Sequence, residues 1–384
     1  MDRKKIVGRV NRIYGKFWNI CLALVYDRQY RSLYKNSGKE YKASKPEINE
    51  YKNKWSVLQK KVNPIYYKLF SNYVRPDVNF LPEDITHNVI ESLLNPPRHR
   101  IYYEDKNMFD KILEDLPDAC PKTLLRRIDK FYYTSLYQPI YDIDNSSLES
   151  YLNGYVRIVV KETLDSCSGQ GVRFFQLDNG LWKDCLNGAL LTVSYLNEIM
   201  GDNYIIQETL EQAEFMKSFN SSSVNTFRLL TYRSISDNKV HVLNAILRIG
   251  KKGSLVDNAH QGGGVIGVSL EGHLNHFLTD QYGLRYTEFN GIDFSKQDFV
   301  VPCWDIIKEF ASQLAERVLY NRIINLDIML DDNMKPRLIE YNLRGMSIWL
   351  YQFNNGACFR EYTDEIIEYC CQHKHEIRSE YLML

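Results

Sequence analysis

Two acidic residues and one asparagine flank a short polar turn near the C-terminal end of the sequence, and oxygen side chains in that pattern can bind a divalent cation. The runs on either side of the turn alternate apolar and polar side chains, which predicts a β-hairpin. If the connecting loop spans residues 331–336, Asp327 lies opposite Glu340. Asn342 follows two residues later and therefore falls on the same face of the hairpin.

This register also pairs Leu330 with Arg337, and it places the two carboxylates side by side. Like charges that face each other across strands destabilise a sheet, so the pair persists most easily when a cation lies between them. Hard oxygen ligands favour magnesium or manganese. The alternative is a solvated hairpin that carries scattered acidic residues and binds no metal.

A second segment has the features of a phosphate-binding loop. Two alternating runs, 155–161 and 172–175, predict a strand pair, and the connection between them is rich in serine and glycine. Backbone N–H groups of such a loop can cradle phosphate oxygens, and Lys161 at the end of the first strand can add a positive charge. The chain contains no Walker A sequence, and taken alone the segment also fits an ordinary hairpin loop.

Two arginines lie on strands that we expect to be neighbours. Residues 224–231 and 241–249 have the pattern of adjacent strands, which places Arg228 and Arg248 in one region of a sheet. Together their guanidinium groups could bind one anionic ligand. Further along, a glycine tract formally satisfies G-x-G-x-x-G, but polar residues precede it and no helix pattern follows, so we reject a Rossmann fold.

The composition is that of a soluble globular protein large enough for two or three packed subdomains. The chain has 384 residues, 44% of them hydrophobic, and a formal net charge of zero. No apolar run approaches the length needed to span a bilayer, and the N-terminus shows no signal-peptide pattern, so we expect a cytoplasmic location. The eight cysteines form no C-x-x-C pair, which favours reduced structural thiols.

Positive charge is concentrated at the N-terminal end, where residues 1–70 contain seventeen Lys and Arg against five Asp and Glu. Apolar side chains recur there at helical spacing, at Val10, Ile13, Tyr14, Phe17, Cys21 and Leu24, with Arg9, Arg12, Lys16 and Asn19 on the opposite side. This pattern suits peripheral contact with an anionic membrane surface, such as the inner face of a membrane. It also fits a helix that packs on the body of the protein. No nucleic-acid-binding module accompanies the charge, so we expect no nucleic-acid partner.

The first 100 residues have mainly helical patterns, and the remainder is richer in strands, which predicts an α+β protein. One helix is expected to open at Pro82–Asp84 and to end at the asparagine and two prolines of 95–97. Asp105 stands in the cap region of a further helix start. Trp304–Leu319 has the pattern of an amphipathic helix that leads into the C-terminal hairpin.

The order of these motifs resembles the ATP-grasp superfamily over about residues 100–350. A lysine after a helical region, a second lysine before a glycine-rich loop, an apolar strand that ends in Gln-Glu and a D…E-x-N hairpin follow one another. Three segments are further similar to the sugar-transfer associated ATP-grasp proteins, namely Tyr103–Asn107, Ser223–Arg228 and Leu247–Gly250 with the glycine tract beyond it.

The resemblance implies a fold of two α+β lobes that grip ATP, preceded by a mainly helical, basic region. The implied division is 1–100 for the helical region, 101–205 for the N-terminal lobe with the phosphate loop, and 206–384 for the C-terminal lobe with the metal site. Two departures from related enzymes concern substrate and nucleotide preference. Leu343–Gly345 replaces the Ser-Pro-Gly version found in peptide ligases, and Gln207 stands where an acid is common.

The resemblance also implies roles for individual residues. Those implied to bind ATP are Lys106, Lys161, Ser168, Gly169, Gly171, Gln207, Glu208, Leu210 and Glu214. The two lysines would contact the phosphates, the loop would close over them, and the Gln-Glu strand end would form the adenine hinge. The glutamate at 214 would hold the ribose hydroxyls, with Glu211 as a rival for that role.

For the metal and the chemistry, Asp327, Glu340 and Asn342 resemble magnesium ligands, and Arg228 and Arg248 resemble residues that neutralise the transferring phosphoryl group. The implied activity is an ATP- and Mg²⁺-dependent carboxylate–amine ligase that acts through an acylphosphate in surface-polysaccharide biosynthesis. Its substrates would be a small-molecule or carrier-linked carboxylate and an amine. The alternatives are an ATP-grasp kinase that phosphorylates a sugar or other hydroxyl, and a nucleotide-binding scaffold without catalysis.

Overall fold

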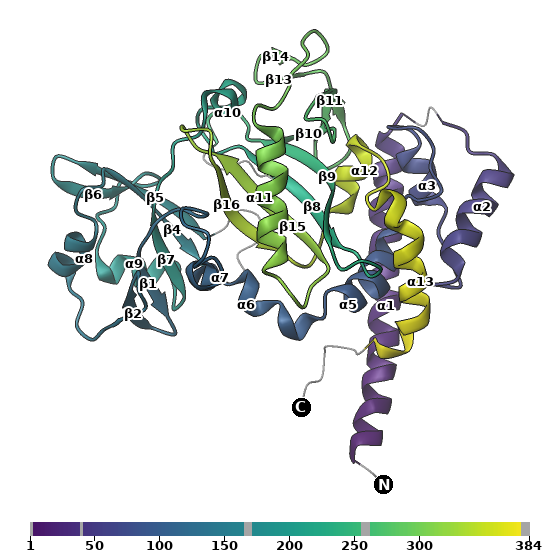
Figure 1. Ribbon diagram of the computed structural model, residues 1–384, viewed down its shortest axis with the longest axis horizontal. Coiled ribbons are helices and arrows are strands. Elements are labelled where there is room, and N and C mark those ends of the chain that lie inside the picture. The colour runs from purple at the N-terminus through teal and green to yellow at the C-terminus, as the bar shows by residue number, and fades with distance from the viewer. Residues whose placement is uncertain (1–2, 39–40, 165–170, 255–261, 378–384) are drawn as a thin grey trace.

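The computed structural model describes residues 3–38, 41–164, 171–254 and 262–377, and these form a helical N-terminal region followed by two antiparallel sheets (Figure 1). The α+β prediction is therefore confirmed. The smaller-numbered strands build one seven-stranded sheet, and the later strands build a second, also of seven strands. The three-part division at 100 and 205 stays a proposal, and the strand Tyr204–Glu208 spans the second of these boundaries.

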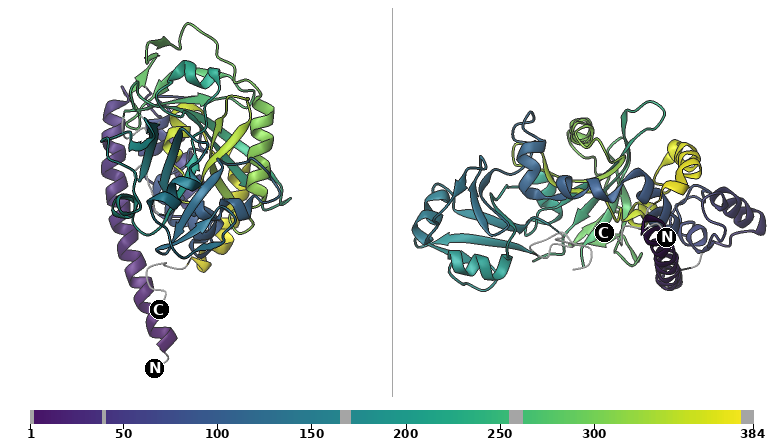
Figure 2. Two further views of the ribbon diagram at one scale, coloured as in Figure 1. Left: turned by 90° about the vertical axis from the view of Figure 1, so that its left-hand side faces the viewer. Right: turned by 90° about the horizontal axis from the view of Figure 1, so that it is seen from below.

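The N-terminal region is built on the long helix α1 (Arg3–Asn36), whose C-terminal half packs on the body. Tyr30 and Leu33 of that half are buried. The other end of α1 extends beyond the rest of the molecule, as two views show (Figures 1 and 2). No helix among the described residues has both the length and the apolar character needed to cross a membrane.

Shorter helices complete the helical region. They are α2 (Lys45–Ser56), α3 (Ile65–Phe70), α4 (Glu83–Ile85), α5 (Glu91–Leu94), α6 (Ile101–Glu104) and α7 (Phe109–Ile112). A π-helical turn, Thr86–Ile90, joins α4 to α5, so the predicted helix start at Pro82–Asp84 is confirmed. The short helical turn Lys106–Met108 is capped by Asp105, whose side chain accepts the Asn107 N–H, as the sequence predicted.

The first sheet has the strand order β3-β2-β1-β7-β4-β5-β6. Its strands are β1 (Thr123–Ile128), β2 (Phe131–Thr134), β3 (Pro139–Ile140), β4 (Arg157–Glu162), β5 (Val172–Asp178), β6 (Leu181–Asp184) and β7 (Tyr204–Glu208). The helices α8 (Asn145–Tyr151) and α9 (Val193–Met200) contribute Leu148 and Leu196 to a core shared with these strands. The predicted pairing of the strands around the phosphate loop is confirmed, since Lys161 on β4 pairs with Val172 on β5.

The second sheet has the order β12-β11-β10-β9-β8-β15-β16. Its strands are β8 (Thr226–Arg233), β9 (Val240–Ile249), β10 (Gly264–Val268), β11 (Leu274–Thr279), β12 (Arg285–Tyr286), β15 (Ile323–Leu330) and β16 (Pro336–Asn342). A separate small hairpin pairs β13 (Glu288–Phe289) with β14 (Ile292–Asp293), and α10 (Glu214–Phe219) follows the first sheet. The adjacency of β8 and β9 predicted for the two arginine strands is confirmed.

Helices cover both faces of the second sheet. One face packs on α11 (Trp304–Glu316), whose buried Ile307 and Leu314 share a core with Leu326 and Ile328 of β15. The other face packs on α12 (Ile348–Asn354), α13 (Thr363–His373) and the N-terminal helices (Figure 2). Because alternate residues of β15 face opposite sides, its odd-numbered residues, including Asp327, point away from α11.

Candidate active site

The β15–β16 hairpin brings the predicted carboxylates together, because Asp327 pairs directly with Glu340 and Asn342 pairs with Asn325. The predicted pairing of Leu330 with Arg337 is wrong, since Leu330 pairs with Pro336. The turn is one residue shorter than expected, and a β-bulge at Ile339 compensates before the acidic pair is reached. The bulge lets Leu338 and Tyr341 both enter the core while Glu340 stays on the site face.

Asp327 is held by both predicted arginines. Arg228, which lies opposite it in the sheet, donates Nε and Nη2 to the two carboxylate oxygens at 2.7 Å each, and Arg248 donates Nη1 at 3.0 Å. The Asn342 amide donates to the same carboxylate at 3.4 Å. Burial would raise the pKa of Asp327, but the Arg228 and Arg248 charges outweigh burial and lower it. The carboxylate is therefore ionised, and two guanidinium groups and the Asn342 amide surround it.

Both predicted lysines lie near Glu340. Lys106 donates to its Oε1 at 2.7 Å, and Lys161, on β4 of the first sheet, is close enough for the charges of Lys106 and Glu340 to affect it. Burial and the neighbouring Lys106 charge lower the pKa of Lys161 to about 8, against the opposing pull of Glu340. Side chains from the helical region and from both sheets thus converge on one acidic pair.

A short connector holds Lys106 between the two sheets. Its backbone N–H bonds to the Thr163 carbonyl beyond β4 at 3.3 Å, and the side chain of Asn107 bonds to the Thr163 hydroxyl at 3.3 Å. On the other side, Glu104 accepts the N–H of Leu343, just after β16, at 3.1 Å. The sequence reasoning used Lys106 but missed Glu104, although the latter stands within the quoted Tyr103–Asn107 segment.

The proposed adenine hinge lies where β7 ends. Gln207 is buried, and its amide donates to the Pro121 carbonyl at 3.1 Å, while Glu208 accepts the Lys122 N–H at 2.9 Å. Both side chains therefore brace the strand end, so a base would have to be recognised by backbone groups. Leu210 follows in the connection, but no contact distinguishes it.

The two glutamates proposed for the ribose lie close to the same lysine, Lys217. Glu214 opens α10 with an exposed side chain and bonds to Lys217 at 3.0 Å, and Glu211 lies 3.7 Å from the same Lys217 nitrogen. In the loop, Ser168 and Gly169 lie outside the described residues. Gly171 has φ +73°, a conformation that favours glycine, and a Cβ there would also force the flexible Glu162 side chain to shift.

Two buried asparagines that support the site were missed. Asn225 donates to carbonyls at Met216 and Asn220 and accepts the Gly250 N–H, which fixes the segment before β8 to the end of β9. Asn95 donates to the backbone carbonyls of Ile323, the first residue of β15, and Leu343, which directly follows β16. It thereby links the start and the end of the hairpin. In the sequence, only two features could have pointed to them. Asn225 lies in Ser223–Arg228, a segment similar to the ATP-grasp proteins, and Asn95 directly precedes two prolines.

The donor set fits Mg²⁺. Two carboxylates and the free amide oxygen of an asparagine share one face of the hairpin, and such hard oxygen donors are the ligands that this ion prefers. No group of three or more His, Cys, Asp or Glu able to hold a metal occurs in the described parts of the chain. Arginine and lysine charges balance the two carboxylates.

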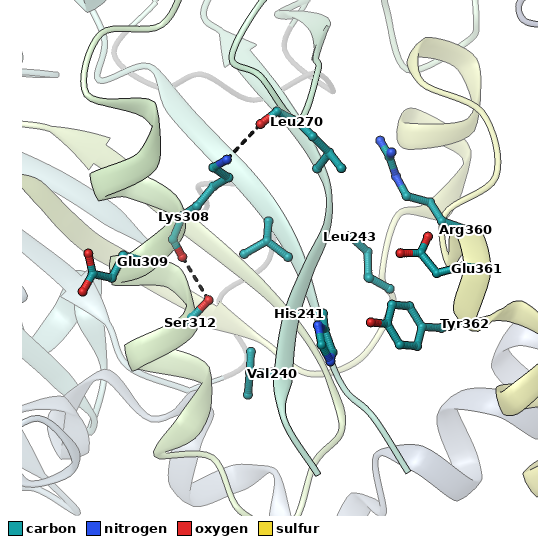
Figure 3. A pocket seen from close by; sticks show the side chains of 11 residues that line it. Val240, His241, Leu243, Leu270, Lys308, Glu309, Ser312, Arg360, Glu361 and Tyr362 are labelled. Carbon is teal, nitrogen blue, oxygen red and sulfur yellow. Dashed lines mark hydrogen bonds between the residues drawn. The ribbon is translucent and has the colours of Figure 1, made fainter. Parts of the chain in front are cut away.

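A separate cavity of about 370 Å³ lies between α11, β9 and the segment before α13 (Figure 3). Its lining includes His241, Lys308, Ser312 and Arg360. Lys308 is already engaged, since it donates to the Leu270 carbonyl at 3.0 Å. None of the predicted site residues lines this cavity, so it is distinct from the acidic pair.

Comparison with protein families gives one match, to the family described as sugar-transfer associated ATP-grasp, over residues 86–368. No curated protein matches the chain. Among solved structures, it is similar to the D-alanine–D-alanine ligase from Bacillus anthracis, with 14% identity, a TM-score of 0.37, and coverage of 72% of this chain and 69% of that one.

Two further solved structures are similar. One is a RiPP-associated ATP-grasp ligase from Chryseobacterium gregarium, with 12% identity, a TM-score of 0.38, and coverage of 74% of this chain and 65% of that one. The other is N5-carboxyaminoimidazole ribonucleotide synthetase from Thermotoga maritima, with 12% identity, a TM-score of 0.33, and coverage of 64% of this chain and 43% of that one. The chain thus spans less than two thirds of the length of both proteins.

Proposed function

The chain belongs to the sugar-transfer associated ATP-grasp family, and we propose that it is an ATP- and Mg²⁺-dependent carboxylate–amine ligase that acts through an acylphosphate. The observation that carries this proposal is the paired Asp327 and Glu340, with Lys106, Arg228 and Arg248 in contact with them. Two negative and three positive side chains at one place suit a ligand that carries both phosphates and metal ions.

Each group has a role that follows from its contacts. Lys106 and Lys161 would bind phosphate oxygens of ATP, and binding would raise the pKa of Lys161 by adding negative charge beside it. Asp327, Glu340 and Asn342 would hold Mg²⁺, which would offset the negative charge that develops on the phosphates during transfer. Lys106 contacts Glu340 from the turn Lys106–Met108, and Lys161 lies on β4 of the other sheet, so closure of the two lobes would bring both lysines to the phosphates.

Arg228 and Arg248 would act in the transfer itself. Both now pair with Asp327, and with Mg²⁺ bound at that carboxylate their guanidinium groups would neutralise the transferring phosphoryl group. An oxygen of the acid substrate then attacks the γ-phosphorus, the bond to the β,γ-bridging oxygen breaks, and ADP leaves. The amine attacks the acyl carbon, phosphate leaves with the bonding electron pair, and the surplus amine proton passes to solvent. No side-chain nucleophile is needed, so positioning and electrostatics provide the catalysis.

Hydroxylamine distinguishes this activity from its alternatives. With ATP, Mg²⁺ and a panel of sugar acids and amino acids, the purified chain should release ADP and form a hydroxamate, because hydroxylamine captures an acylphosphate. A stable phosphorylated product without hydroxamate would instead identify a kinase. Tight ATP binding with no ADP formed across the panel would leave only a nucleotide-binding scaffold.

We further propose that the acid or amine belongs to a surface-polysaccharide precursor, which the family description supports, and that the protein acts in the cytoplasm at the inner face of the membrane. The support for membrane contact is α1. Phe17, Ile20 and Leu24 follow one another at helical spacing and are each more than 60% exposed. Residues 3–26 contain six Lys and Arg and no Asp or Glu, which complements an anionic surface.

Vesicle sedimentation tests this placement. The protein should sediment with vesicles that contain phosphatidylglycerol and stay in solution with pure phosphatidylcholine. Replacement of Phe17, Ile20 and Leu24 by serine should abolish sedimentation. Leu136 and Tyr141, which are 78% and 89% exposed, provide the control, because their replacement by serine removes apolar surface from a different region. Equal loss in both variants would contradict a role for α1.

A further inference from the structure

A buried ionic cluster lies in the helical region, outside the residues that the mechanism uses. Glu83, His87 and Glu91 stand four residues apart, and the π-helical turn lies between the two glutamates. His87 contacts both, with Nε2 2.9 Å from Glu83 Oε1 and Nδ1 2.5 Å from Glu91 Oε2. Tyr30 of α1 donates its hydroxyl to the remaining Glu83 oxygen at 2.6 Å. The glutamate side chains are only 2% and 8% exposed.

The histidine is a cation in this environment. Burial alone would lower its pKa, but the Glu91 and Glu83 carboxylates outweigh burial and raise the pKa of His87 to about 11. A positive charge between two buried glutamates removes their mutual repulsion, and it fixes which way each carboxylate points. Tyr26 stacks on the ring at 5.5 Å and leaves it little freedom to turn.

The second carboxylate oxygen of Glu91 binds the loop that follows the candidate active site. Glu91 Oε1 accepts the N–H of Met346 at 3.0 Å, which joins residues 255 positions apart in the chain. Met346 belongs to the loop Leu343–Ser347, which begins directly after Asn342 and leads into α12. The loop contains Gly345 and Ser347, both with positive φ, so its conformation is one that the backbone does not adopt by default.

The same loop is held at its start by the helical region as well. Glu104 accepts the Leu343 N–H at 3.1 Å, and Asn95 donates to the Leu343 carbonyl at 2.8 Å. Asn325 on β15 donates to the Met346 carbonyl at 3.0 Å. Buried or half-buried side chains therefore fix both ends of the loop, and one of them, Glu91, is itself fixed by the cluster with His87 and Glu83.

We propose that Glu91, oriented by His87 and Glu83, is a positioning residue that holds the loop Leu343–Ser347 so that Asn342 stays in place to bind the metal of Mg–ATP. This role rests on the proposed function, because it concerns the same metal site. Glu91 would touch neither substrate nor metal. Its loss would let Met346 and the preceding backbone move. Nucleotide binding would then require a higher Mg²⁺ concentration, while the contribution of the lysines to nucleotide binding would change less.

The test measures binding of a fluorescent ATP analogue as a function of Mg²⁺ concentration. In Glu91→Ala, we expect the Mg²⁺ concentration for half-maximal binding to rise about tenfold, which corresponds to about 1.4 kcal/mol. Glu91→Gln should be intermediate, because the amide oxygen can still accept the Met346 N–H while the ion pair with His87 is lost. The near-isosteric Gln variant also keeps the test valid if the Ala variant fails to fold.

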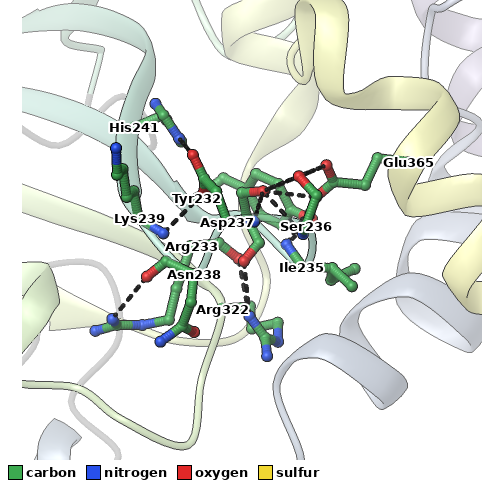
Figure 4. A network of polar contacts seen from close by, with 11 residues as sticks. Tyr232, Arg233, Ile235, Ser236, Asp237, Asn238, Lys239, His241, Arg322 and Glu365 are labelled. Carbon is green, nitrogen blue, oxygen red and sulfur yellow. Dashed lines mark hydrogen bonds and ion pairs between the residues drawn. The ribbon is translucent and has the colours of Figure 1, made fainter.

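Glu365 provides a matched control (Figure 4). Its carboxylate also accepts a backbone N–H, from Ile235 at 2.7 Å, and it bonds to Tyr232 at 2.6 Å, but it fixes the turn between β8 and β9. Glu365→Gln should lower the free energy of unfolding and leave the Mg²⁺ dependence unchanged. The proposal is overturned if the Glu91 variants lose stability alone, or if Glu365→Gln shifts the Mg²⁺ dependence equally. A wild-type chain without any Mg²⁺-dependent nucleotide binding would instead overturn the proposed function.

Discussion

Replacement of Asp327 by asparagine is the sharpest perturbation of the candidate site. The Asp327 side chain is 4% exposed, and the Arg228 and Arg248 side chains that bond to it are 12% and 13% exposed. Asparagine keeps one oxygen acceptor, but its NH₂ group would face a guanidinium donor, and the balancing negative charge would be gone. Both arginines would then lose the carboxylate that they share.

The magnitude follows from the burial of this network. Removal of one partner from a buried ion pair costs about 3–5 kcal/mol, because the remaining charge is left without compensation. Asp327 accepts three charge-assisted hydrogen bonds from arginine, at 2.7, 2.7 and 3.0 Å, but the retained amide oxygen can still accept some of them. We therefore expect Asp327→Asn to lower the free energy of unfolding by about 3 kcal/mol. Mg²⁺-dependent binding of ATP should be lost as well.

The assay combines urea unfolding with titration of a fluorescent ATP analogue at several Mg²⁺ concentrations. Asp331→Asn is the matched control, because Asp331 is also buried in this hairpin and pairs with Arg337 at 2.8 Å, away from the acidic pair. The control should lose comparable stability but keep its Mg²⁺ dependence. The reasoning is refuted if Asp327→Asn keeps wild-type stability and Mg²⁺ dependence, or if both variants lose that dependence to the same extent.

Three further variants test the phosphate-binding residues. Lys106→Met should weaken ATP binding about tenfold in the same titration, because a positive charge close to the phosphates is lost. Binding of ATP should also weaken as pH rises through about 8, where free Lys161 loses its proton, and Lys161→Met should remove this pH dependence. Since the Lys161 pKa falls from its usual 10.5 to about 8 on folding, wild-type stability in urea should rise over that pH window relative to Lys161→Met. Gly171→Ala should destabilise the chain by about 1 kcal/mol or more, and by more than Gly188→Ala, which shares the positive φ but meets no neighbouring atom.

Local pattern was enough to predict the hairpin and the pairing of its acidic residues. The alternation of side chains fixed which residues share a face, but it contains no signal for turn length or for a bulge. The two errors, a turn one residue too long and an unrecognised bulge at Ile339, cancelled before Asp327 was reached. The strands of Arg228 and Arg248 were likewise predictable, because their runs are long and apolar.

Contacts between distant segments were not predictable from residue types. Glu91 and His87 have the spacing of an ordinary solvated helix face, and only the fold shows that they are buried and reach Met346. The resemblance implied that Lys106 binds the ATP phosphates, but nothing in the sequence predicted its contact with Glu340, since 234 positions separate the two residues. Glu211 and Glu214, the two ribose candidates, lie near the same lysine, Lys217, a proximity that their spacing in the sequence does not reveal.

A crystal structure with Mg²⁺ and a non-hydrolysable ATP analogue tests the central claim most directly. We expect Mg²⁺ within about 2.1 Å of oxygen atoms of Asp327, Glu340 and Asn342, and Lys106 and Lys161 in contact with the phosphates. A bound nucleotide whose metal ions lie elsewhere, with Asp327 still enclosed by Arg228 and Arg248, would contradict the claim.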